Sequence, residues 1–82
     1  MNIAIVLSGS GVYDGAEIHE STLTMLAIHQ EGSSYQCFAP DVDQMHVINH
    51  YSGAEMKESR NVLVESARIA RGDIQPIDEL DL

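Results

Sequence analysis

The sequence predicts an α/β fold built on a parallel sheet. Residues 2–7, NIAIVL, form a continuously apolar, β-branched run, which is typical of a strand covered on both faces. A glycine-rich turn at 8–15, SGSGVYDG, separates this run from a segment at 16–31 whose residues favour a helix. Strand, turn and helix in this order begin a βαβ unit, and we expect the first strand to be central in its sheet.

The first helix and the second strand complete the βαβ unit. We expect the helix to end at Gly32, a residue type favoured just after a helix C-terminus. YQCFAP at 35–40 predicts the second strand, closed by Pro40. The apolar face predicted for the helix consists of Ile18, Leu23, Leu26 and Ala27.

The rest of the chain predicts one further strand and one further helix. MHVINH at 45–50 alternates in polarity and predicts a third strand at the edge of the sheet. A second helix is predicted over 57–71, ended by Gly72 and followed by an acidic, weakly patterned tail. Its predicted buried residues are Val62, Leu63, Ala67 and Ala70. Because a parallel sheet needs several strands with helices on both faces, we interpret 1–82 as a single incomplete α/β domain, the N-terminal part of a larger one.

Composition excludes several classes of partner and compartment. Thirteen acidic residues against four basic ones give a formal charge of −9, which repels a nucleic-acid backbone. The single cysteine, Cys37, cannot form an intramolecular disulfide, so a reducing compartment is expected. The apolar stretch IAIVL is too short for a signal-peptide core or a membrane span. These features predict a cytoplasmic protein that binds neither nucleic acid nor membrane.

The glycine-rich turn admits two interpretations. Gly9 and Gly11 stand where a dinucleotide-binding fingerprint begins, but the third glycine of that pattern would fall at Asp14. Nucleotide binding stays open only as an alternative, with Asp41 in the place of a ribose-binding acid. The acids after the turn can stabilise a helix N-terminus by about 0.3–1 kcal/mol, or one can act as a proton carrier at the carboxyl end of a strand.

The histidines do not predict a metal site. His46 and His50 lie four residues apart, a spacing that suits a metal pair on a helix. The segment that carries them reads as strand and turn, where side chains four apart need not converge. His19, beside the acids, is a candidate hydrogen-bond partner for a substrate.

Several unusual stretches resemble one protein family. IAIVLSGSGVYDGAEIHESTLTMLAI, CFAPD, VINH and ESRNVLVESARIARGDI, in that order, are similar to the N-terminal part of the enhancing lycopene biosynthesis proteins, ElbB, also called isoprenoid biosynthesis glyoxalases. The family belongs to the class I glutamine amidotransferase-like superfamily. The resemblance implies a flavodoxin-like parallel sheet sandwich.

The resemblance also implies a glyoxalase (lyase) reaction. A cysteine on a strand-to-helix elbow attacks glyoxal or methylglyoxal, and a glutamate at the start of the first helix shuttles protons to give a hydroxy acid, without cofactor or metal. Glu20 best suits that glutamate, and Glu17 is the alternative. Gly9 and Gly11 would let the backbone approach the substrate, and His19 would contact it.

The elbow cysteine of the family has no counterpart in this sequence. Cys37 lies inside a predicted strand between Gln36 and Phe38 and lacks the strand-turn-helix context, so we interpret it as a small buried apolar residue. Two functions follow. The chain is either part of a dicarbonyl-converting enzyme linked to isoprenoid biosynthesis, inactive alone, or a non-catalytic binding or assembly module, for which a homodimer is the expected partner.

Overall fold

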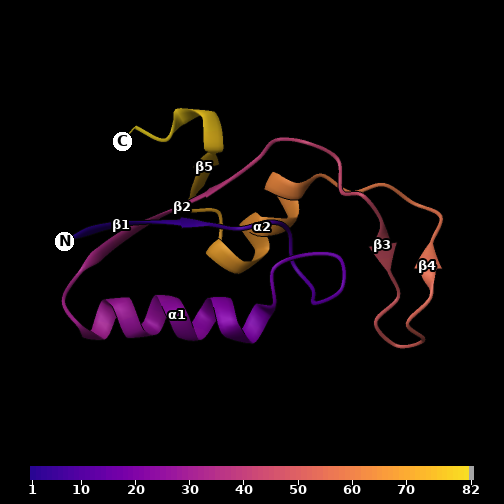
Figure 1. Ribbon diagram of the computed structural model, residues 1–82, viewed down its shortest axis with the longest axis horizontal. Coiled ribbons are helices and arrows are strands. Elements are labelled where there is room, and N and C mark those ends of the chain that lie inside the picture. Colours follow the sequence, from indigo (N-terminus) through magenta and orange to yellow (C-terminus); the bar gives the residue numbers. More distant parts are fainter. Residues whose placement is uncertain (82) are drawn as a thin grey trace.

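The computed structural model describes residues 1–81, in which a three-stranded parallel sheet carries two helices (Figure 1). Its strands lie in the order β1-β2-β5, and a separate two-stranded antiparallel ribbon, β3-β4, extends away from it. In chain order the elements are β1 (Asn2–Val6), α1 (Ile18–Gln30), β2 (Ser34–Ala39), β3 (Val47–Ile48), β4 (Glu55–Met56), α2 (Val62–Ala70), β5 (Ile74–Pro76) and the short 3-10 helix η1 (Ile77–Glu79).

Both helices pack on the same face of the sheet. β1 pairs with β2 from Asn2 opposite Ser34 to Val6 opposite Phe38, and β2 pairs with β5. Since alternate strand residues share a face, one face carries the buried core. That core consists of Leu7, Met25 and Cys37, packed by Ile5, Ala16, Ile69, Ala70 and Ile74. The predicted α/β class, parallel sheet and βαβ unit are therefore confirmed.

Two strand predictions are wrong. The segment 45–50 does not join the sheet; Val47 and Ile48 pair instead with Met56 and Glu55 in the antiparallel ribbon. The third strand is Ile74–Pro76, in the segment predicted as an unpatterned tail. Within residues 1–81, β1 has one neighbour only, and the strand between two others is β2.

The predicted apolar face of α1 is also wrong. Leu23 is 63% exposed and Leu26 48% exposed, whereas Met25 is buried and Ile28 half-buried. The least exposed side chains of the helix are those of residues 21, 25 and 28. The buried face is therefore displaced by about one residue from the predicted face. The predicted C-terminal end of the helix agrees with the structure: Gly32 follows the last turn with φ of +79°, as expected for a glycine after a helix.

The second helix is shorter than the predicted 57–71. Asn61 caps its N-terminus, because the side-chain oxygen accepts a hydrogen bond from the backbone N–H of Val64 at 2.9 Å. Residues 57–60 therefore lie outside the helix. Val62 is buried and Leu63, Ala67 and Ala70 are half-buried, which confirms the predicted face, but Glu65 and Ser66 are buried there as well.

Candidate functional site

The glycine-rich turn connects the carboxyl end of β1 to the N-terminus of α1 and folds tightly back on itself. Gly9 has φ of +106°, a conformation that glycine adopts without strain. A Cβ on Gly15 would lie 2.6 Å from the backbone nitrogen of Ser10. The N–H of Gly11 donates to the carbonyl of Ala16 at 2.9 Å. The conformation of Gly9 and the close packing of Gly15 are thus required by the turn itself, and the predicted contact of Gly9 and Gly11 with substrate stays a prediction.

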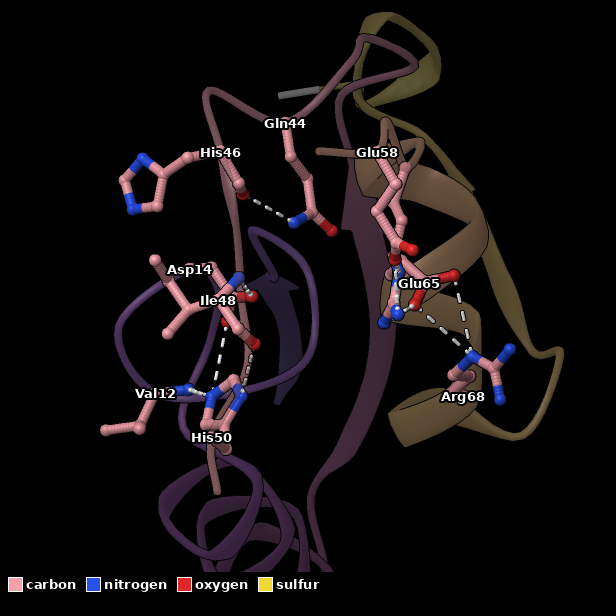
Figure 2. A network of polar contacts seen from close by, with 10 residues as sticks. Val12, Asp14, Gln44, His46, Ile48, His50, Glu58, Glu65 and Arg68 are labelled. Carbon is pink, nitrogen blue, oxygen red and sulfur yellow. Dashed lines mark hydrogen bonds and ion pairs between the residues drawn. The ribbon is translucent and has the colours of Figure 1, made fainter. Parts of the chain in front are cut away.

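The segment 46–50, which includes β3, is fastened to this turn by polar contacts (Figure 2). Asp14 Oδ2 accepts a hydrogen bond from the N–H of Ile48 at 2.8 Å. The N–H of Val12 donates to His50 Nε2 at 3.2 Å, and the ring of Tyr13 stacks on that of His50 with centroids 5.9 Å apart. These contacts join residues 34 to 38 positions apart in sequence and hold the ribbon beside the turn.

A solvent-open cavity of about 260 Å³ lies between the turn and residues 43–46. The carboxyl ends of strands in open α/β sheets are where such folds bind ligands, and the turn that lines this cavity follows the carboxyl end of β1. The turn contributes Ser8, Tyr13, Asp14 and Gly15 to the lining, and the facing segment contributes Gln44 and His46 among others.

The three candidate residues at the start of α1, Glu17, His19 and Glu20, have different surroundings. Glu17 is the N-cap: its carboxylate accepts from the backbone N–H of His19 at 3.1 Å and of Glu20 at 2.8 Å. These backbone hydrogen bonds hold the pKa of Glu17 below its ordinary value. The His19 ring is exposed, and its Nδ1 lies 3.2 Å from Glu17 Oε1. Within residues 1–81 the carboxylate of Glu20 makes no hydrogen bond, and the residue is exposed.

A buried hydroxyl connects the turn to the second helix. Ser66 is fully buried, and its Oγ accepts a hydrogen bond from the N–H of Gly9 at 2.8 Å. A buried N–H without an acceptor costs about 1–3 kcal/mol, so this contact fixes where α2 lies relative to the turn.

We expect Ser66→Ala to lower the free energy of unfolding by about 2 kcal/mol, because the buried Gly9 N–H loses its acceptor. Urea denaturation measures this change. Ser52→Ala is the matched control, since Ser52 is exposed at the tip of the ribbon, and it should change stability by less than about 0.5 kcal/mol. Equal effects of the two variants would contradict the role assigned to Ser66.

Glu65 is the other buried polar residue of α2. Its carboxylate lies 3.4 Å from Arg60 Nη1 and 3.4 Å from Arg68 Nε (Figure 2). Arg60 also hydrogen-bonds Glu58 through Nε at 2.6 Å, and these carboxylates raise the pKa of its guanidinium. Opposite charges therefore compensate the buried carboxylate, and we assign this cluster a structural role.

Cys37 is buried and reduced, as the sequence predicted. Burial raises the pKa of its thiol, and the Sγ lies 4.0 Å from Met25 Sδ. Since the thiolate is the nucleophile, a buried thiol of raised pKa is unsuited to attack a carbonyl.

No cluster of three metal-ligating side chains occurs within residues 1–81. Asp41, the candidate ribose ligand, accepts from Asn61 Nδ2 at 2.7 Å.

Sequence reasoning missed the residues that assemble the turn: Asp14, His50 and Ser66. Asp14 was considered only as the residue in place of a third fingerprint glycine, and its side chain proves to be 4% exposed and bonded to the ribbon. Nothing local in the sequence signals that Ser66 reaches Gly9, because 57 residues separate them.

Comparison with known proteins identifies similar chains. The chain is 56% identical over 79 residues to "ES1 protein homolog, mitochondrial" from Rattus norvegicus and to "Glutamine amidotransferase-like class 1 domain-containing protein 3, mitochondrial" from Homo sapiens. A crystal structure of an isoprenoid biosynthesis protein with amidotransferase-like domain from Ehrlichia chaffeensis matches all of this chain with a TM-score of 0.99 and 41% identity. The chain is similar to one part of these amidotransferase-like proteins.

The chain spans only part of these proteins. It covers 30% of the length of the rat and human relatives and 39% of the Ehrlichia chain. No protein-family model matches it. The predicted resemblance and the flavodoxin-like fold class are confirmed for the part of the domain that the chain covers.

The predicted cytoplasmic location is wrong. The rat and human relatives, and a Danio rerio relative 43% identical over 72 residues, are all named mitochondrial proteins. A lone cysteine indicates a reducing compartment but does not distinguish the cytosol from other reducing compartments. Within residues 1–81, no helix has the length and apolar character needed to cross a membrane.

Proposed function

We propose that this chain forms the N-terminal part of an amidotransferase-like enzyme that converts glyoxal or methylglyoxal to a hydroxy acid, with Glu20 as the proton carrier. The observation that carries the proposal is the contrast between the two candidate glutamates. Both oxygens of Glu17 accept backbone hydrogen bonds at the start of α1, whereas the Glu20 carboxylate makes none within residues 1–81.

A proton carrier must be free to bind and release a proton near the reacting atoms. Glu17 is unsuited to this task because protonating it would weaken the cap that starts the helix, and its lowered pKa favours the charged form. Glu20 lies one helical turn further on, with its backbone fixed by Glu17 and its side chain unengaged. Glu17 therefore orients the first turn, and Glu20 is the remaining acid for the chemistry.

The reaction needs a thiol that the rest of the domain must supply, since Cys37 is buried. The thiol adds to the aldehyde carbon of methylglyoxal, and its proton passes to the carbonyl oxygen to form a hemithioacetal. Transfer of the hydrogen from the former aldehyde carbon to the neighbouring carbon, by way of a base, gives a thioester. Water then cleaves the thioester to the hydroxy acid and returns the thiol. The aldehyde carbon is oxidised and the ketone carbon reduced, so no external oxidant is consumed.

The relation to isoprenoid biosynthesis rests on the name of the Ehrlichia protein. We extend it to this chain as part of the same proposal: the enzyme would remove reactive dicarbonyls in cells that make isoprenoids.

The test replaces the matching segment of the Ehrlichia protein with residues 1–82 of this chain and measures methylglyoxal consumption. We expect the chimera to turn over methylglyoxal and the isolated chain to show none, because the isolated chain lacks an accessible thiol. The intact Ehrlichia protein is the control. A folded chimera without turnover would contradict the enzyme proposal.

The same preparations test the alternative, a non-catalytic assembly module. Exposed Leu23 and Leu26 on α1 favour association of some kind. An isolated chain that is a defined dimer by size-exclusion chromatography, together with an inactive chimera, would support the module.

A further inference from the structure

The contact between the turn and the ribbon leaves two hydrogen-bond acceptors side by side with no proton between them. The Nδ1 of His50 lies 2.9 Å from the carbonyl oxygen of Ile48. A carbonyl only accepts, so Nδ1 carries a proton. The Nε2 lies 3.2 Å from the N–H of Val12, which only donates, so Nε2 presents its lone pair. The ring is therefore the neutral Nδ1–H tautomer.

Asp14 is left with an unmatched oxygen in this arrangement. Its side chain is 4% exposed, and Oδ2 is satisfied by the N–H of Ile48. Oδ1 is buried without a hydrogen-bond partner within residues 1–81, although it lies 3.3 Å from His50 Nε2. Two acceptors, the carboxylate oxygen and the imidazole lone pair, thus face each other with no proton between them.

From this geometry we infer that His50 and Asp14 form a proton-dependent clasp that controls the backbone of the glycine-rich turn. When His50 gains a proton at Nε2, the positive ring forms an ion pair with the Asp14 carboxylate, whose Oδ1 lies 3.3 Å away. Nε2 then has no lone pair for Val12, whose N–H loses its acceptor. One proton therefore exchanges the hydrogen bond from Val12 for an ion pair with Asp14, and the turn is released at Val12.

The surroundings of His50 suit this exchange. The ring is half exposed, so a proton can reach it from solvent. In the described chain the titratable groups against the ring are Asp14 and Tyr13, from the turn. His46, which enters the ribbon, contacts the carbonyl of Tyr13 at 3.3 Å rather than the His50 ring.

The clasp goes beyond the proposed function and does not depend on it. It predicts that the turn at the mouth of the cavity is ordered when His50 is neutral and loosened at Val12 when His50 is protonated. A ligand in that cavity would thus meet two forms of the turn.

NMR spectroscopy of the chain tests the inference. The nitrogen shifts of the His50 ring report its tautomer and titration, and hydrogen exchange reports protection of the Val12 N–H relative to an unstructured peptide at the same pH. We expect the Nδ1–H tautomer at high pH, and a loss of Val12 protection by about threefold to tenfold as pH falls through the His50 titration, the range for one lost hydrogen bond.

Two variants sharpen the result. Asp14→Asn keeps an acceptor for the Ile48 N–H but removes the negative charge beside Nε2, so the loss of Val12 protection should move to lower pH. His29→Gln, at an exposed histidine in the last turn of α1, should leave it unchanged. A neutral ring with its proton on Nε2, or Val12 protection that is constant through the His50 titration, would overturn the inference. If Asp14→Asn does not fold, the wild-type chain and His29→Gln still decide it.

Discussion

Replacing Glu20 by glutamine in the active chimera is expected to lower the rate of methylglyoxal consumption by about 10²-fold to 10⁴-fold, the usual contribution of one positioned acid or base. Glutamine has the same shape as glutamate but cannot carry the proton. Because the Glu20 side chain makes no hydrogen bond within residues 1–81, the substitution removes no contact that holds the fold. Kinetics measured with thermal melts of each variant separate catalysis from stability.

Glu17→Gln is the informative comparison. Glutamine keeps one side-chain oxygen, which can accept one of the two backbone hydrogen bonds at the start of α1, but it loses the second acceptor and the charge that favours the helix N-terminus. We expect a small loss of stability and a rate within about tenfold of the unmodified chimera. Glu31→Gln, at the exposed C-cap of the same helix, controls for a change of charge alone. A large loss of rate in Glu17→Gln with little loss in Glu20→Gln would reverse the assignment of the two residues.

The parts of the fold that were predictable are those in which pattern and local chemistry agree. The run 2–7 is β-branched and apolar, and the glycines at 32 and 72 follow helix ends. Residues 74–76 were missed because a three-residue strand ending in proline carries no periodic signal, and its pairing with β2 is set by the helix packed between them. The ribbon was mistaken for a sheet strand because alternation predicts a strand but not its partner.

The orientation of α1 shows the same limit. Leucine is the more apolar choice, so Leu23 and Leu26 appeared to define the buried face, yet Met25 occupies the core beside Leu7 and Cys37. Leu23 and Leu26 thus form an exposed apolar surface on this helix, which the helical pattern alone cannot distinguish from a buried face.

The candidate site was predictable only in its local part. A glutamate at the start of α1 was expected, but glutamate is not a preferred N-cap residue, so only the structure separates Glu17, the cap, from Glu20. The clasp was not accessible to the same reasoning, because Asp14 and His50 meet only after the ribbon has folded back onto the turn. Short-range rules place residues on elements, and long-range packing decides which of them meet.

The turn also makes the chain sensitive to a single added methyl group at Gly15. In Gly15→Ala the new Cβ would lie 2.6 Å from the Ser10 nitrogen and 2.9 Å from the carbonyl carbon of Gly9. Both atoms belong to the backbone, so relief requires the turn to open rather than a side chain to rotate. We expect the free energy of unfolding to fall by about 3 kcal/mol, the upper end for overpacking. For a chain of 82 residues, total stability is about 4–12 kcal/mol, so this loss is a large share.

Gly53→Ala separates this clash from the general cost of replacing a glycine. Gly53 has φ of +82° at the tip of the ribbon, and a Cβ there would meet no atom within 4 Å. Its replacement should cost about 1 kcal/mol from backbone conformation alone. Urea denaturation of the two variants gives the comparison, and the amide signals of Val12 and Ile48 should shift in Gly15→Ala only, since the turn carries Val12 and holds Ile48 through Asp14. Equal losses of stability with unchanged signals would mean that the turn accommodates the methyl group, and that the close packing of Gly15 against Gly9 and Ser10 does not hold the turn in shape.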